Sequence, residues 1–341
     1  MKYDSTVIKS TTPPPRWQDL VKPYQTPETL KSVWQVVNTV IPLFLMFYVM
    51  YRGMSYSYWL TLLLAIPTSG LMVRLFIIQH DCGHGSFFKS SKANDLVGTF
   101  CAFLTVIPYF QWRHEHAIHH ATSGDLQRRG VGDVNTLTVN EYLALPPLKR
   151  FEYAFYRHPL VMLLIGPTYV FGLCSRFVGK HSGKRERNNV YLTNAVILAQ
   201  IVGWSWLIGF KTFMLLWGPV FIIAGVAGVW LFYVQHQYEN TYWRNTKEWD
   251  YATAAVQGSS FYHLPRILQW FTGNIGYHHI HHLSPKIPNY KLQRCHEETP
   301  MFQTAVELTF RESLKCASLR LWDEEHRKMV GFAYLKTLAA R

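Results

Sequence analysis

Histidine is the residue type whose spacing in this chain most clearly allows chemistry. The chain contains 16 histidines among 341 residues, and most of them fall in three short windows. The first window reads HDCGH at 80–84, the second WRHEHAIHH at 112–120 and the third GYHHIHH at 276–282. Neutral imidazole is a frequent ligand of zinc, copper, iron and nickel. The windows therefore predict a metal site.

The spacing inside each window matches the geometry of a helix. Residues three or four positions apart lie on one helical face. His80 and His84 are four apart, and in each of the other windows one histidine is followed by two more at the third and fourth positions. His114 and His279 fall on other faces, so we leave both out. The predicted metal and catalytic histidines are His80, His84, His116, His119, His120, His278, His281 and His282.

Isolated histidines are interpreted differently. A single histidine near an apolar face is usually a hydrogen-bonded structural residue. We apply this interpretation to His158, His181, His263, His296 and His326. It does not extend to the windows, because eight clustered imidazoles beside a membrane would be costly to bury without a bound ion.

The choice of metal rests on the number and type of ligands. The five cysteines are widely spaced and form no C-x-x-C pair, so thiolate ligation is not indicated. One zinc ion takes about four ligands, and eight imidazoles are too many for it. Neither the E-x-x-H motif of soluble di-iron proteins nor the H-E-x-x-H motif of zinc proteases occurs. Two irons in an all-nitrogen site fit best.

The elements that position these histidines are predicted to be membrane helices. Hydrophobic residues make up 49% of the chain and charged residues 16%, against about 25% charged in a typical soluble domain. Residues 33–73 contain one charged residue, Arg52, and residues 190–234 contain one, Lys211. A helix needs about 20 apolar residues to cross a bilayer. We therefore expect two helical hairpins, with spans at about 33–51, 56–78, 190–210 and 213–235.

Two shorter uncharged runs, 96–112 and 159–175, are 17 residues long each. Basic clusters flank the second run on both sides, which disfavours a crossing, since basic residues concentrate on the cytoplasmic side. The first run lies between two histidine windows that must share one site. We expect both runs to be in-plane or re-entrant.

The net charge of +13 is interpreted as membrane-side electrostatics and not as nucleic-acid binding, because the basic residues flank apolar spans. The N-terminus shows no pattern of a cleaved signal peptide. With two hairpins, both termini and the long polar segments face the cytoplasm. The expected fold is an all-α integral membrane protein with four transmembrane helices, in-plane segments and a helical cytosolic cap that carries the histidine windows.

The motifs together resemble a known family. The stretches HDCGHGSFF, WRHEHAIHHATSGDL, FYVQHQYENTYW and GNIGYHHIHHLSPKIPNY look like those of membrane fatty-acid desaturases of the histidine-box type, closest to bacterial acyl-lipid desaturases of the omega-6 or cold-induced type. The likeness covers about 30–310 of what we expect to be a single domain, 1–341. It implies a ninth metal ligand between the second and third boxes, at His236.

The resemblance also implies an activity. It implies oxygen-dependent desaturation of a fatty acyl chain at two irons, with electrons from a separate ferredoxin or flavodoxin-like donor, in the inner membrane of a bacterium and with the site on the cytoplasmic side. The first box has three intervening residues where acyl-CoA desaturases typically have four. The third box begins with His278 where front-end desaturases have glutamine. A membrane lipid acyl chain is therefore the expected substrate.

Two questions stay open at the level of sequence. Polar residues near the boxes could orient the imidazoles or could merely cap helices and loops; the candidates are Asp81, Glu115, Asp125, Asp133 and Asn274. The same boxes could also serve a hydroxylase or a carotenoid ketolase, or a membrane metal-binding protein without catalytic activity.

Overall fold

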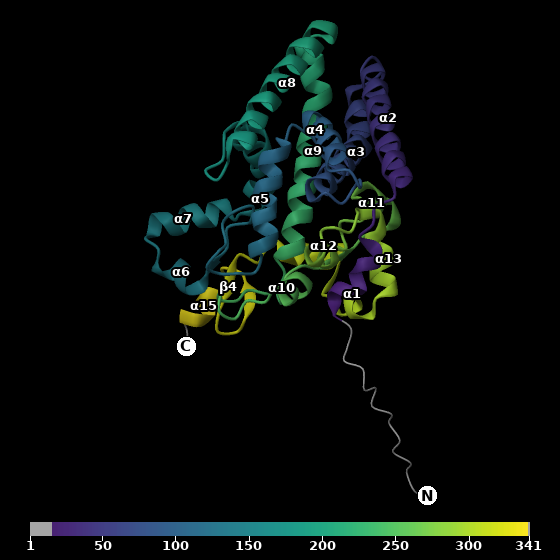
Figure 1. The fold of residues 1–341 in the computed structure, drawn as a ribbon. Helices are drawn as coiled ribbons and strands as arrows, with labels where there is room; N and C mark the ends of the chain where they lie inside the picture. The colour runs from purple at the N-terminus through teal and green to yellow at the C-terminus, as the bar shows by residue number, and fades with distance from the viewer. Residues whose placement is uncertain (1–15, 340–341) are drawn as a thin grey trace, which may run out of the picture.

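Long apolar helices dominate the computed structural model, which describes residues 16–339. Four helices are long and apolar enough to cross a membrane: α2 (Thr29–Gly53), α3 (Tyr58–His84), α8 (Lys184–Ile208) and α9 (Phe210–His236). They form two antiparallel pairs, α2 with α3 and α8 with α9, which extend to the same side of the molecule (Figure 1). This confirms the expected all-α membrane fold.

Most helix ends extend beyond the predicted apolar spans, although α3 begins and α8 ends two residues inside them. Hydropathy marks only the part of a helix that lies in hydrocarbon, whereas the backbone hydrogen bonds continue until a capping signal appears. For α3 that signal is Gly85, which has a positive φ of 67° and ends the helix directly after His84. The first histidine window is therefore helical along its whole length. We expect no signal peptide in the N-terminal stretch 1–17. Residues 1–15 of this stretch lie outside the described residues.

The run 96–112 is divided between two helices. Ser91–Thr105 forms α4 and Tyr109–Thr122 forms α5, and the two axes are bent by 102° at the break. Val106 has a positive φ of 58° and Pro108 precedes α5, so the backbone at the break cannot continue one helix. The Tyr109 hydroxyl donates to the Cys82 carbonyl at 2.8 Å and so joins α5 to the end of α3.

The run 159–175 follows the amphipathic helix α7 (Pro147–Tyr156), which lies across the direction of the long helices (Figure 1). Two π-helical turns, η2 (Val161–Ile165) and η3 (Thr168–Leu173), and a 3₁₀ turn, η4 (Cys174–Arg176), make up the run, at 61° to α7. Leu148, Phe151 and Phe155 are exposed on the outer face of α7. Tyr153 on the inner face is buried and donates to the Arg320 carbonyl at 2.6 Å.

The segment after α9 and the short N-terminal elements form a cap at one end of the long helices (Figure 1). Its N-terminal part is α1 (Trp17–Val21) and η1 (Lys22–Tyr24). The later helices and turns are α10 (Tyr251–Gln257), α11 (Arg266–Phe271), α12 (His278–Leu283), α13 (Asn289–Glu298), η5 (Pro300–Thr304), α14 (Phe310–Cys316) and α15 (Tyr334–Ala339). A short α6 (Val139–Ala144) joins this layer.

The cap also contains two small sheets that the sequence pattern does not indicate. One has the order β1 (Leu137–Thr138), β4 (Leu321–Asp323) and β5 (Lys328–Val330), and the other pairs β2 (Phe261–His263) with β3 (Glu307–Thr309) in parallel. These strands fasten the C-terminal segment to the layer that holds the third histidine window.

Candidate metal centre

The three histidine windows converge at the cap-side ends of the long helices. His80 and His84 lie in the last turns of α3, the second window forms most of α5, and the third window is the short helix α12. His236 is the last residue of α9. Four chain segments that are far apart in sequence therefore deliver imidazoles to one place.

Five of these imidazoles form a first group whose nitrogen atoms all lie within 4.8 Å of one another; its members are His80, His84, His116, His120 and His281. The Nε2 atom of His120 is 3.1 Å from that of His116 and 3.0 Å from that of His281. Three ring nitrogens thus face one point, as the ligands of a shared cation do.

A second group contains His119, His236 and His282. The Nε2 atom of His278 is 3.0 Å from that of His236, which brings a fourth imidazole to this group. The rings of His120 and His282 stack with their centroids 4.1 Å apart, so the two groups are neighbours in one centre. The structure thus brings together all nine histidines expected as ligands, including His236.

Three imidazoles are fixed through their Nδ1 atoms. The Nδ1 of His80 lies 3.1 Å from a carboxylate oxygen of Asp81, and that of His119 contacts Asp133. The Nδ1–H of His236 donates to the Gly258 carbonyl at 3.1 Å. An imidazole whose Nδ1 carries the proton has a free lone pair on Nε2, which is the form that binds a metal. The contacts assign this tautomer to all three rings.

Asp81 is in turn held by a residue that the sequence did not indicate. The backbone N–H and the side-chain amide of Asn289 donate to the other carboxylate oxygen of Asp81 at 2.7 and 2.8 Å. The amide of Gln35 donates to Asn289 at 3.0 Å. This chain of hydrogen bonds reaches from α2 through the start of α13 to His80, an expected ligand, in α3. No local pattern signals it, because its members are 208 and 254 positions apart.

The remaining polar candidates have other partners. Asp125 binds the Arg128 guanidinium at 2.6 Å and the Thr246 hydroxyl, and Asn274 donates to the Asn289 carbonyl. Glu115 lies against the loop at Gly179, and its carboxylate interacts with His114 and His181, which belong to neither group. His279 contacts His296 at 3.3 Å and not the two groups. Asp81 and Asp133 are thus the sequence candidates that contact a ligand.

The unpaired nitrogens test whether metal ions suit this centre. Among the described residues, buried nitrogen atoms without a hydrogen-bond partner include Nε2 of His84, His119 and His282. Buried polar atoms are normally paired, so such a concentration at one place needs an explanation. Two groups of five and four imidazoles would leave room for further ligands on two six-coordinate ions, and imidazole nitrogen is a donor that suits iron.

The electrostatics of α12 agree with this interpretation. Burial lowers the pKa of His278, His281 and His282 well below the ordinary value, and neighbouring histidines lower it further. A protonated ring would be repelled by several others in a medium that hydrates it poorly. The rings are therefore held in the neutral state that a metal ion requires.

Aromatic side chains surround the two groups. The ring of Trp112 stacks on His116 at 4.5 Å, one turn before it on α5. Phe232 contacts His119 and His236 at 5.1 and 5.2 Å between centroids. Large rings at these places restrict water around the nitrogens and hold the imidazoles in one orientation.

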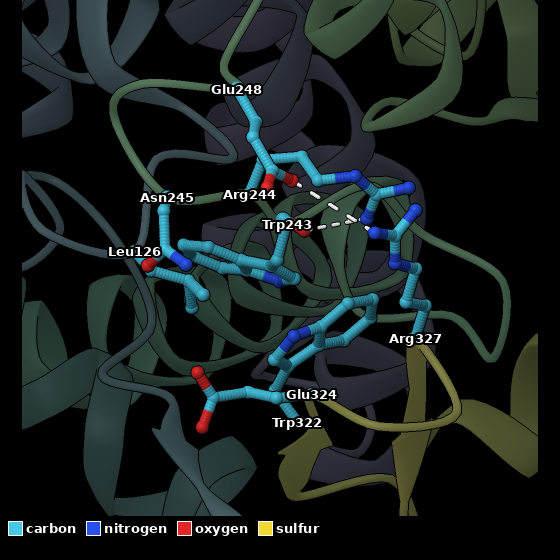
Figure 2. A pocket seen from close by; sticks show the side chains of 8 residues that line it. All are labelled: Leu126, Trp243, Arg244, Asn245, Glu248, Trp322, Glu324 and Arg327. Atoms are coloured by element: carbon cyan, nitrogen blue, oxygen red, sulfur yellow. Dashed lines mark hydrogen bonds and ion pairs between the residues drawn. The ribbon is translucent and has the colours of Figure 1, made fainter.

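A separate pocket of about 120 Å³ lies in the cap (Figure 2). No histidine lines it; the lining residues are Leu126, Trp243, Arg244, Asn245, Glu248, Trp322, Glu324 and Arg327. Its two arginines are balanced by two glutamates, and Arg327 and Glu248 lie 3.9 Å apart. The pocket is thus distinct from the metal centre.

Comparison with known proteins agrees with the geometry. The model of the family described as "Fatty acid desaturase" matches residues 57–312. A fatty acid desaturase of Bacillus subtilis is 46% identical over 93% of this chain and 90% of the relative. The sn-1 oleoyl-lipid 12-desaturase of Synechocystis is 28% identical over 72% of this chain and 70% of the relative. A chloroplastic omega-6 fatty acid desaturase of Arabidopsis thaliana is 29% identical over 71% of this chain and 54% of the relative.

The family match contains all three histidine windows and His236, and the four apolar helices are those of a membrane enzyme. Ordered boxes, a converged imidazole centre and a relative of nearly equal length all lead to one assignment. This chain belongs to the fatty acid desaturase family and is an oxidoreductase that desaturates fatty acyl chains.

Proposed function

We propose that the chain is an acyl-lipid desaturase that holds two irons with nine histidines. The observation that carries the proposal is the convergence of two neighbouring imidazole groups, one of five and one of four members. The first group would bind one iron, and His119, His236, His278 and His282 would bind the other. The residues 1–341 form one domain in this proposal, with a core at about 30–310.

Desaturation of a methylene pair needs a strong oxidant, because an unactivated C–H bond offers nothing to an acid, a base or a nucleophile. When bound, the two irons supply the redox chemistry by which dioxygen and two electrons remove two hydrogens from neighbouring carbons. With two further protons, both oxygen atoms leave as water and a C=C bond remains. The electrons come from an external donor of the ferredoxin or flavodoxin class.

The protein's own residues orient the ligands and keep them neutral. Asp81, Asp133 and the Gly258 carbonyl fix three imidazoles in the metal-binding tautomer. Trp112 and Phe232 shield the rings. The centre lies at the ends of apolar helices, so a lipid acyl chain in the same leaflet can reach it. A glycerolipid substrate is supported by the three-residue spacing of the first box and by the similarity to an oleoyl-lipid desaturase.

The location is part of the same proposal. We place the chain in the inner membrane of a bacterium, with the cap and the metal centre on the cytoplasmic side, where reduced electron carriers are available. The basic residues that flank the helices agree with this side.

Expression in a host whose lipids lack the product tests the function. Gas chromatography with mass spectrometry of derivatised lipids is expected to reveal a new double bond, and the His119→Ala variant is expected to lose it. A product that is heavier by one oxygen atom would indicate a hydroxylase instead. Unchanged lipids, combined with less than one iron per purified chain, would indicate a metal-binding protein without this activity.

A further inference from the structure

We infer that Arg157 is a positioning residue that aligns the second histidine group. The inference rests on the two-iron centre proposed above. Arg157 follows α7, contacts no imidazole and was not indicated by any motif. It is 1% exposed, which makes it one of the largest fully buried side chains among the described residues.

The guanidinium of Arg157 connects three segments of the chain. Its Nη1 donates to the Asn135 carbonyl at 2.8 Å and to the Thr136 hydroxyl at 3.1 Å. Its Nη2 lies 2.9 Å from the side-chain carbonyl of Gln237 and 3.2 Å from the Tyr233 hydroxyl. The same nitrogen is 3.1 Å from the Leu319 carbonyl.

All of these acceptors are neutral, and no carboxylate forms an ion pair with Arg157 in the part of the chain that the structure describes. A buried charge without a counter-charge is costly, and only well-aligned hydrogen bonds offset the cost. The planar guanidinium can meet acceptors in several fixed directions, whereas a lysine ammonium donates from one point. The site is therefore built for the shape of arginine and not merely for a positive charge.

Two of the segments that Arg157 joins lie directly beside members or partners of the second histidine group. Asn135 and Thr136 directly follow the loop of Asp133, which contacts the Nδ1 of His119. Gln237 directly follows His236, and its side-chain carbonyl also accepts from the Thr136 hydroxyl at 3.1 Å. One guanidinium thus binds the backbone near Asp133, the partner of His119, and the side chain of the residue that follows His236.

No comparable link joins Arg157 to the first group. That group is held through Asp81 and Asn289 on α3 and α13. The two groups share the helices α5 and α12, but the hydrogen bonds that support His80 are separate from those that support His119 and His236. A role of Arg157 in positioning predicts a selective defect, in which the second metal position weakens while the first one stays intact. A general structural role predicts loss of both together with loss of stability.

The test measures metal stoichiometry in the purified full-length chain under anaerobic titration with ferrous iron. The Arg157→Lys variant keeps the positive charge but loses the planar guanidinium that donates in several fixed directions. We expect it to bind close to one iron per chain at concentrations where the unaltered chain binds two, with the weaker position reduced by about 10–100-fold, the effect typical of residues that orient ligands. Mössbauer spectra are expected to lose one of two iron signals.

Arg176→Lys is the matched control, since Arg176 is a partly buried arginine that binds the Val106 carbonyl and Asn194 and lies away from the second group. It is expected to keep two irons. The milder Thr136→Val removes one contact of Arg157 and is expected to weaken only the second position.

The inference is overturned if Arg157→Lys binds two irons as tightly as the unaltered chain, or if it loses both in parallel with its thermal stability while Thr136→Val binds two normally. An unaltered chain that binds fewer than two irons would instead refute the proposed function, so the two failures can be told apart.

Discussion

Each imidazole of the centre must present one particular nitrogen, and the residue beside its other nitrogen decides which one. Asp81 and Asp133 do this for His80 and His119, one in each group. Asp125 is nearer to the second box in sequence than Asp133 and is fully buried, yet it binds Arg128 and Thr246. Proximity in sequence thus could not separate these carboxylates. Their partners come from tertiary contacts.

Exchange of Asp133 for asparagine is expected to weaken iron binding by about 10–100-fold, because an amide holds the His119 ring less firmly and does not raise its basicity. Competitive titration with a chelator measures this. Asp125→Asn is the same exchange at another buried aspartate that contacts no imidazole, and it is expected to leave the affinity for iron unchanged. Equal losses in both variants would contradict the special role of Asp133.

The iron-free chain is expected to become less stable as the pH falls below about 6.5, the ordinary histidine pKa. Burial lowers the pKa of His278, His281 and His282, so the unfolded chain binds more protons than the folded chain between the lowered values and 6.5. The free energy of unfolding therefore rises with pH in that window, and the chain loses this contribution to its stability on acidification. Above pH 7.5 these three histidines are expected to add no pH dependence to the free energy of unfolding.

Thermal denaturation of iron-free protein at pH 5.5, 6.5 and 7.5 measures the slope. The His282→Gln variant lacks one of the contributing groups, and its slope is expected to be shallower. A melting temperature that stays constant between pH 7.5 and 5.5 would show that these rings are not held neutral by the fold.

Single elements differ in how well the sequence predicts them. The four long helices follow from local hydropathy, and the boxes follow from helical spacing, so both were predictable. The strands were not, because β2 and β3 have three residues each and pair across long separations, as Phe261 does with Glu307. Asn289 and Arg157 were missed for the same reason, since their partners lie in other elements.

The junction between α4 and α5 depends on a glycine. A Cβ at Gly98 would overlap the Tyr109 ring, whose hydroxyl ties α5 to the end of α3. Gly98→Ala is therefore expected to destabilise the chain by about 1–3 kcal/mol, the usual cost of overpacking, and to lower iron binding at the first group. Denaturation in detergent and iron analysis measure both effects.

Gly203→Ala provides the control, since a Cβ at Gly203 in α8 meets no atom within 4 Å. It is expected to be neutral or slightly stabilising, because alanine favours helix. Loss of stability in Gly203→Ala equal to that in Gly98→Ala would show that the close approach of Tyr109 is not the cause.

The arrangement of the whole molecule restricts how the chain crosses the membrane. The ends of α3, α5 and α9 and the helix α12 meet in one centre, so they must lie on one side of the bilayer. His84 and His116 are 5.0 Å apart between ring centroids. The bent pair α4 and α5, which joins them, therefore returns to the side where it began.

The same reasoning applies to the segment between α5 and α8. The hairpin of α8 and α9 crosses twice and ends at His236 in the centre, so α8 must begin on the side of the centre. The segment from α7 through η4 then makes no net crossing. Four spans satisfy these conditions, whereas six spans would separate the imidazoles.

Cysteine labelling in intact cells tests this topology. The background is a chain in which the exposed Cys174 is replaced by serine. Ser55→Cys lies in the turn of the first hairpin and Lys211→Cys lies in the first turn of α9, next to the turn of the second hairpin. Both are expected to react with a membrane-impermeant maleimide. Lys180→Cys, just before α8, is expected to react only after permeabilisation. Labelling of Lys180→Cys from outside would mean that the preceding segment crosses the bilayer, which would carry His236 to the opposite leaflet from His84 and leave no single centre for the irons.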